Sequence, residues 1–136
     1  MKTLLTLLFI LPFFVFSQKS VIKKTYNLNG LEIAQFDFLE PMTYDVAVKE
    51  CLKLGEGWRL PTKEEMEDIY ENKDMLGGFV SLIYVSDNSE FSIGNNVYYW
   101  SSSTYDSDYI WVIGFTHKFV AVTLKTEYLY ARAVKK

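Results

Sequence analysis

The sequence is poor in residues that form cross-links or bind metals. Among its 136 residues there is one cysteine, Cys51, and one histidine, His117. A single thiol excludes an intramolecular disulfide, although exported domains of this size commonly depend on disulfides. One cysteine and one histidine also leave too few ligands for a conventional zinc site. Stability must therefore come from the burial of apolar side chains, which a domain of this length can supply.

Basic residues are also scarce relative to acidic ones. The chain carries 14 Lys and Arg against 17 Asp and Glu, so its formal net charge is −3. Because there is no basic excess and no Lys/Arg block, the composition indicates neither nucleic-acid binding nor attachment to an anionic membrane surface. Hydrophobic residues make up 49% of the chain, too many for a disordered protein. The length fits one domain.

The N-terminus has the three parts of a secretory signal peptide. Lys2 precedes an apolar run over residues 4–16, and Val15-Phe16-Ser17 places branched or small residues before a cleavage site. The run is shorter than the roughly 20 residues that span a bilayer. We therefore predict that residues 1–17 are removed and that the chain is exported without a membrane span, to the periplasm, the cell surface or the medium. A retained N-terminal anchor is the alternative.

Local patterns in the first half of the mature chain predict a strand and two helices. Alternating apolar and polar residues predict a half-buried strand over residues 31–38. A period of 3.6 residues predicts a helix over residues 44–54, ended by Gly55. A second helix begins at Thr62, because Thr62 and Glu65 have the spacing of a capping box.

The second half of the chain is rich in strand-forming residues. Three segments are predicted strands: 109–115, 119–124 and 127–134. Very short turns join them, which predicts an antiparallel meander, and apolar residues on both faces of 109–115 predict a strand that is covered on both sides. We therefore expect one α+β domain over residues 31–136, preceded by an N-terminal extension of residues 18–30.

A series of aromatic and arginine motifs runs through this domain. It comprises Gly57-Trp58-Arg59-Leu60-Pro61-Thr62-Lys63-Glu64-Glu65, Tyr99-Trp100-Ser101-Ser102-Ser103, Trp111, Phe115 and Ala131-Arg132-Ala133-Val134-Lys135. In this order the motifs resemble the Lcl C-terminal domain family, a family related to the formylglycine-generating enzymes. The resemblance covers about residues 31–135. It implies a C-type-lectin-like fold, with two helices packed on an antiparallel sheet and long irregular loops, and it implies export.

The motif residues are expected to have structural roles, with ligand contact as the alternative. Trp58 lies between the predicted helices and Trp111 lies within a strand covered on both faces, which are positions typical of a core. The two motif arginines need buried carboxylates or carbonyl oxygens as partners. The residues to which we assign a structural role are Trp58, Arg59, Pro61, Thr62, Glu65, Trp100, Ser101, Trp111 and Arg132.

No catalytic residue is expected. Cys51 is the only candidate nucleophile of the kind that the related oxidases use, but their chemistry needs more than one cysteine. Cys51 also lies on the apolar stripe of the first helix, where a buried thiol is inert. His117 lies in a predicted tight turn, where exposure to solvent is expected. An enzyme-like role related to the formylglycine-generating oxidases remains the alternative.

Two irregular segments, residues 86–96 and 103–108, carry the predicted ligand-binding residues. Carboxylates and amides bind sugar hydroxyls, and a tyrosine ring stacks on the C–H surface of a sugar. The candidates are Asp87, Asn88, Glu90, Asn95, Tyr105, Asp106 and Asp108. We expect no cofactor. Calcium binding by Asp106 and Asp108 is the alternative to a solvated turn, although the carbohydrate-binding triplets of calcium-dependent lectins are absent.

The sequence thus predicts an exported, non-catalytic binding or adhesion module. Its expected partner is a polysaccharide or protein of the cell envelope or the extracellular space. A structural envelope protein without a small ligand is a further alternative.

Overall fold

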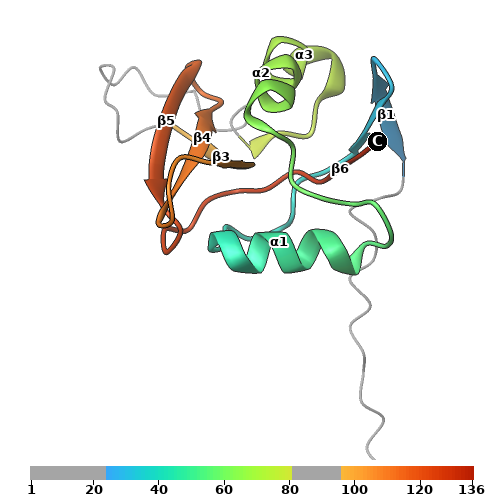
Figure 1. The fold of residues 1–136 in the computed structure, drawn as a ribbon. Helices are drawn as coiled ribbons and strands as arrows, with labels where there is room; N and C mark the ends of the chain where they lie inside the picture. The colour runs from blue at the N-terminus through green and yellow to red at the C-terminus, as the bar shows by residue number, and fades with distance from the viewer. Residues whose placement is uncertain (1–23, 81–95) are drawn as a thin grey trace, which may run out of the picture.

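Two antiparallel sheets and three helices make up the part of the chain that the computed structural model describes, residues 24–80 and 96–136 (Figure 1). The first sheet has the strand order β1-β2-β6, from β1 (Thr25–Leu28), β2 (Leu31–Ala34) and β6 (Val134–Lys135). The second has the order β3-β4-β5, from β3 (Tyr98–Thr104), β4 (Tyr109–Gly114) and β5 (Phe119–Leu124). The helices are α1 (Tyr44–Lys53), α2 (Lys63–Glu71) and α3 (Lys73–Leu76). The predicted α+β class is confirmed, and the arrangement is compatible with the C-type-lectin-like type.

The first sheet begins inside the segment that we treated as an N-terminal extension. Strands β1 and β2 form a hairpin whose two turn residues, Asn29 and Gly30, have φ angles of 52° and 86°. Such positive φ values match the twist of a two-residue hairpin turn, and Asn27 Oδ1 accepts a hydrogen bond from Gly30 N at 3.1 Å. Neither this turn nor the strand before it is part of the domain predicted over residues 31–136.

The predicted half-buried strand over residues 31–38 is correct only as far as Ala34. Its alternation is wrong, because Ile33 and Ala34 are both fully buried. Successive residues of a strand face opposite sides of the sheet. Ala34 packs into one hydrophobic cluster and Ile33 into another, so β2 is covered on both faces here. Beyond the strand, Asp37 is buried whereas Phe36 is 44% exposed.

Both long helices form where the sequence predicted them. Helix α1 ends at Lys53, two residues before Gly55, and buries Ala47 and Cys51. At the start of α2, Thr62 Oγ1 accepts a hydrogen bond from Glu65 N at 3.2 Å, and Glu65 Oε2 accepts one from Thr62 N at 2.9 Å. The predicted capping box is therefore confirmed. No helix among the described residues is long and apolar enough to cross a membrane.

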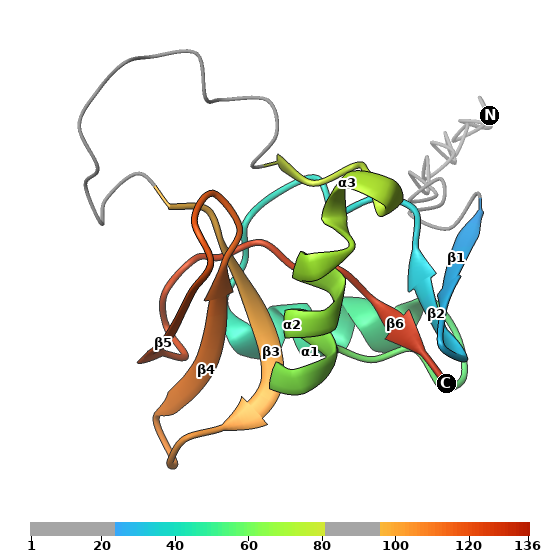
Figure 2. The ribbon, with the colours of Figure 1, turned by 90° about the horizontal axis from the view of Figure 1, so that it is seen from above.

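The predicted meander is correct only in part. Strands β4 and β5 form as predicted, but the third strand of the sheet is β3, which was not predicted, and the strand predicted over residues 127–134 is wrong. This segment runs from the second sheet to the first, as Figure 2 shows, and bonds to a different neighbour at each step. It forms an antiparallel bridge at Leu129 and a parallel bridge at Tyr130, and it joins β2 only as β6. Its composition favours a strand, but no continuous partner strand is available.

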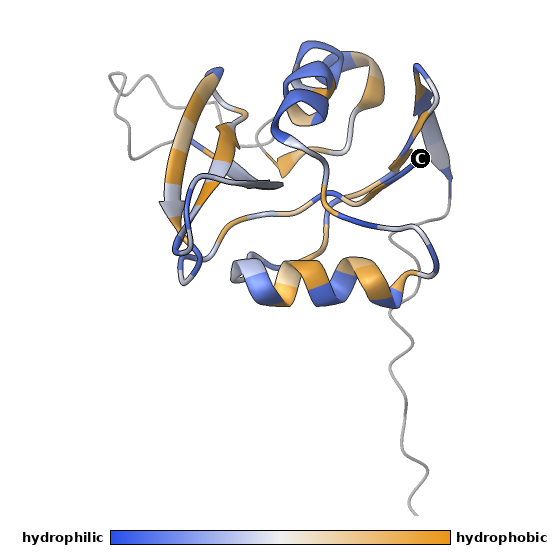
Figure 3. Cartoon of the chain, viewed as in Figure 1, coloured by the Kyte–Doolittle hydropathy of each residue, from blue (hydrophilic) through white to orange (hydrophobic). Residues whose placement is uncertain are grey.

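Two hydrophobic clusters lie on either side of this crossing segment. One packs against α1 and includes Trp58, Trp100 and Val112, and the other packs against α2 and includes Tyr99 and Ile113. Because Val112 and Ile113 belong to different clusters, β4 is covered on both faces at this end, as predicted. Figure 3 shows that apolar residues also line β5, at the outer edge of the second sheet.

Candidate functional site

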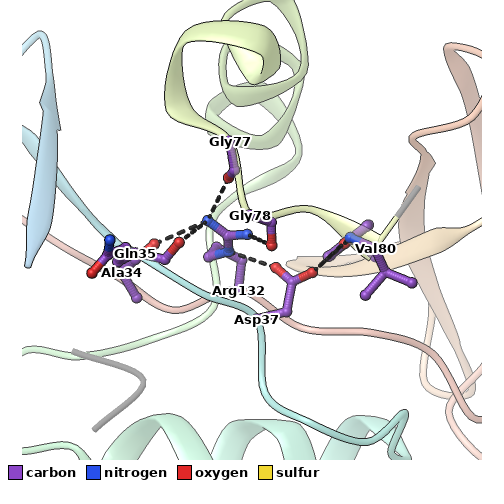
Figure 4. A network of polar contacts seen from close by, with 8 residues as sticks. Ala34, Gln35, Asp37, Gly77, Gly78, Val80 and Arg132 are labelled. Carbon is purple, nitrogen blue, oxygen red and sulfur yellow. Dashed lines mark hydrogen bonds and ion pairs between the residues drawn. The ribbon is translucent and has the colours of Figure 1, made fainter. Parts of the chain in front are cut away.

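Arg132 lies at the centre of a buried polar network in the crossing segment (Figure 4). Its side chain is fully buried, and Nε donates a hydrogen bond to Asp37 Oδ1 at 2.5 Å. The phenyl ring of Phe79 stacks on the guanidinium, with 3.9 Å between Cζ and the ring centroid. Nη1 donates to the carbonyl oxygens of Ala34, Gln35 and Gly77 at 3.1, 3.1 and 3.4 Å, and Nη2 donates to that of Gly78 at 2.6 Å.

Asp37 extends this network into the second sheet. Its Oδ2 accepts hydrogen bonds from the Tyr99 hydroxyl and, at 3.2 Å, from Val80 N. Burial raises the pKa of Asp37, while the charge of Arg132 and the hydrogen bonds from Tyr99, Arg132 and Val80 act in the opposite direction. Burial also raises the pKa of Tyr99, as does the nearby Asp37 carboxylate, so the Tyr99 hydroxyl stays protonated and donates. The network thus links both sheets to the chain that leaves α3.

A second motif arginine, Arg59, holds the start of α2 against the first sheet. Its Nη1 and Nη2 donate to the two carboxylate oxygens of Glu65 at 2.7 and 2.9 Å, a bidentate pair. These hydrogen bonds lower the pKa of Glu65. The backbone of Arg59 exchanges two hydrogen bonds of 2.9 Å with Val134 of β6.

The other motif residues differ in their burial. Trp58 and Trp100 are buried, and Trp100 Nε1 donates to Met42 O at 2.7 Å. Ser101 is also buried and donates from Oγ to Trp111 O at 2.6 Å, next to an irregularity in the pairing of β3 with β4. Pro61 is buried, and its carbonyl oxygen accepts from Ser102 N at 2.7 Å.

Trp111 does not occupy the core position that we expected, because its ring is only half-buried. Tyr109 lies two residues earlier on the same face of β4, and the cross-strand partners of the two residues on β5 are Leu124 and Val122. Tyr109 and Leu124 are 38% and 39% exposed. Helix α2 covers this face further along β4, where Ile113 joins its cluster, but leaves the Trp111 end accessible.

Two residues from neighbouring elements complete this surface. The ring of Tyr105, which is 60% exposed, stands at 83° to the ring of Trp111, with 5.5 Å between their centroids. The Lys63 ammonium, at the start of α2, lies 4.9 Å from the centroid of Trp111. We call the surface made by these residues the aromatic face; its members are Lys63, Tyr105, Tyr109, Trp111, Val122 and Leu124.

The turn between Tyr105 and Tyr109 is held by one of the predicted ligand residues. Asp106 Oδ1 accepts hydrogen bonds from Asp108 N at 2.9 Å and Tyr109 N at 2.8 Å, and Tyr105 N donates to Tyr109 O at 2.9 Å. Both aspartates are exposed. Nowhere in residues 24–80 and 96–136 do three or more His, Cys, Asp or Glu side chains lie together so as to hold a metal ion.

Of the predicted ligand residues, Tyr105 belongs to the aromatic face, and Asp106 and Asp108 lie in the turn between Tyr105 and Tyr109. The others, Asp87, Asn88, Glu90 and Asn95, lie outside the described residues, as does the predicted signal peptide. Sequence reasoning missed Lys63, Val122 and Leu124 as surface partners of Trp111. The short turn between β4 and β5 indicated that these strands pair, and so that Val122 and Leu124 lie close to Trp111. The approach of Lys63 depends on how α2 packs and has no such local signal.

The two residues considered for catalysis lie in different environments, one buried and one exposed. Cys51 is fully buried in the cluster of α1, and burial, together with the charge of Glu50, raises its pKa to about 12. His117 lies exposed in the turn between β4 and β5. Its backbone N and O are both bound by the side-chain amide of Asn96, at 3.3 and 2.9 Å.

A comparison with protein-family models matches residues 26–135 to the Lcl C-terminal domain. The match begins within β1, ahead of the point where the motifs indicated the resemblance, and runs to the end of β6. No curated protein matches the chain in a sequence comparison.

The buried ion pair predicts strong coupling between Asp37 and Arg132. Asp37→Asn leaves the guanidinium buried without a counter-charge, so we expect a loss of about 3–5 kcal/mol in the free energy of unfolding. Arg132→Met is expected to be similarly harmful, and the double variant less harmful than the sum of both single changes. Denaturant unfolding of the four proteins measures the coupling. Additive losses would contradict a direct interaction.

The backbone conformation and close surroundings of Gly78 predict that this position accepts no side chain. Gly78 has a φ of 71°, and a Cβ there would lie 2.7 Å from Gln35 O, beside the Arg132 guanidinium. Gly30 is the matched control, since its φ is 86° and an added Cβ meets nothing within 4 Å. Gly30→Ala should cost about 1–2 kcal/mol for the left-handed backbone, and Gly78→Ala clearly more. Equal losses in thermal or denaturant unfolding would show that the close approach is unimportant.

Proposed function

We propose that this chain, which belongs to the Lcl C-terminal domain family, is an exported, non-catalytic binding or adhesion module. Its partner is a polysaccharide or protein of the cell envelope or the extracellular space. The observation that carries this proposal is the aromatic face. There Tyr105 and Trp111 present their rings at the surface instead of packing into either cluster.

The aromatic face has the properties of a preformed binding surface. Tyrosine and tryptophan offer a large rigid contact area with a polar tip, so little conformational entropy is lost on binding. The rings stand on paired strands, and the turn beside Tyr105 is fixed by the hydrogen bonds to Asp106 Oδ1. An exposed group of large apolar side chains on a rigid element favours recognition of a partner.

The environment of Cys51 supports the non-catalytic part of the proposal. A nucleophilic cysteine reacts as a thiolate and needs access to its substrate. Cys51 is fully buried, and its pKa of about 12 keeps the sulfur protonated at neutral pH. This environment is that of a small apolar core residue.

Export is supported by the N-terminal sequence. Lys2, the apolar run of residues 4–16 and Ser17 have the order of a cleaved signal peptide, which would leave residues 18–136 as the mature chain. The mature chain retains Cys51 as its single cysteine, so it must rely on its apolar core and on the Arg132 network in an oxidising compartment.

A binding screen of the mature chain tests this proposal. We expect residues 18–136 to bind at least one member of a glycan array or of a panel of purified envelope and extracellular matrix proteins. Tyr105→Ala should weaken that binding by roughly tenfold, as loss of a central aromatic contact does. Because the ring is largely exposed, the free energy of unfolding should change by only about 0.5 kcal/mol.

Phe119→Ala is the matched control for this screen. Phe119 is also an exposed aromatic residue of the second sheet, but it lies at the other end of β5 and on the opposite face from Val122 and Leu124. This variant should bind like the wild type. No binding to any member of either panel, or equal loss in the two variants, would refute a binding function centred on the aromatic face.

A further inference from the structure

We propose that the aromatic face binds an uncharged pyranose unit of a polysaccharide, which stacks on Trp111 and is flanked by Tyr105. This inference rests on the proposed binding function and narrows its ligand to neutral sugars. It is carried by the angle between the two rings and by the mixed charge of the rim.

The two rings form a corner that suits a sugar ring. Tyr105 and Trp111 are nearly perpendicular, at 83°, with their centroids 5.5 Å apart. One ring can therefore contact the C–H face of a pyranose while the other contacts its edge. Tyr109 and Leu124, the next cross-strand pair along the same face, extend the apolar floor by one step of the sheet. This extension offers a place for a neighbouring sugar unit.

The rim of the aromatic face carries charges of both signs. The Lys63 ammonium lies 4.9 Å from the Trp111 ring, while the exposed carboxylates of Asp106 and Asp108 occupy the turn that separates Tyr105 from Tyr109. Lys63 has no carboxylate within salt-bridge distance among the residues that the structure describes. A polyanion would meet two carboxylates for one ammonium, and a polycation would meet Lys63 directly over the stacking ring.

A neutral polyhydroxylated ligand can form hydrogen bonds with both the ammonium and the carboxylates. Its hydroxyl groups donate to carboxylates and accept from the ammonium, whereas a charged polymer is repelled by part of the rim. At Asp106 only Oδ1 is used by the turn, where it accepts from two backbone N–H groups. Its Oδ2 has no hydrogen bond to the described part of the chain, so it can accept from a sugar hydroxyl.

Tryptophan fluorescence gives a direct readout of this site. Of the three tryptophans, Trp58 and Trp100 are buried and Trp111 alone is partly exposed. Quenching by acrylamide therefore reports mainly on Trp111. A ligand that stacks on the ring should reduce this quenching.

The experiment titrates the mature chain with a neutral β-glucan, a neutral galactomannan, alginate as a carboxylated polymer and dextran sulfate as a sulfated one. We expect a neutral polymer to bind and to protect Trp111 from acrylamide, equally at low salt and in 0.5 M NaCl, because no net charge is neutralised. Tyr105→Ala and Trp111→Leu should weaken binding by roughly tenfold. Lys63→Gln, which keeps a donor but removes the charge, should weaken it far less, and Phe119→Ala should not change it.

The remaining outcomes each overturn the inference in a distinguishable way. Salt-sensitive binding of alginate or dextran sulfate that Lys63→Gln abolishes would replace the neutral sugar by an anionic one and leave the binding function intact. Binding of a purified protein alone, blocked by Tyr105→Ala, would replace the sugar by a protein partner and also leave the binding function intact. Self-association that Tyr105→Ala abolishes, seen by analytical ultracentrifugation, would identify the aromatic face as a contact between copies. No binding to any polymer or protein would refute the function as well.

Discussion

The burial of the Arg132 charge is the constraint on which the rest of this structure depends. A guanidinium out of contact with water is tolerated only when a counter-charge and hydrogen-bond acceptors surround it. Here these partners come from the end of β2, from Asp37 and from the two glycines after α3. Asp37 in turn binds Tyr99 of the second sheet. None of these segments can move away without leaving a buried charge unpaired, so we infer that the two sheets and the chain after α3 fold as one unit.

This arrangement separates the residues that hold the fold from those free to meet a ligand. Of the two motif arginines, Arg132 lies in the interior and Arg59 binds the start of α2, and neither belongs to the aromatic face. The same strand, β4, contributes to both regions. Its Ile113 end is covered by α2, and its Tyr109 end lies beyond the helix, where Trp111 and Tyr105 meet solvent. A rigid core beneath an accessible aromatic surface costs little entropy on binding.

The elements that follow from local rules were predictable. The period of α1, the capping box of α2 and the short turns of the meander are all encoded within a few residues. The wrong predictions concern residues whose positions depend on partners distant in sequence. Residues 127–134 have strand composition but bond to a new neighbour at each step. Asp37 lies in the segment predicted as a half-buried strand, but its ion pair with Arg132 holds it in the interior, beyond the end of β2. At the candidate site, Tyr105 and its turn were predicted, whereas the exposure of Trp111 and the approach of Lys63 depend on how the start of α2 packs against β4.

Native-state hydrogen exchange of the backbone amides tests the claim of a single cooperative unit most directly. Two backbone amides donate hydrogen bonds to the crossing segment, each over 3.0 Å. Ala34 N of the first sheet donates to Ala133 O, and Trp100 N of the second sheet donates to Tyr130 O. If the Arg132 network couples the sheets, these two amides and those within β4 exchange only through global unfolding, with the same free energy of opening. Exchange of Ala34 at a much lower free energy than Trp100, with the second sheet still protected, would contradict the coupling and with it the central role of Arg132.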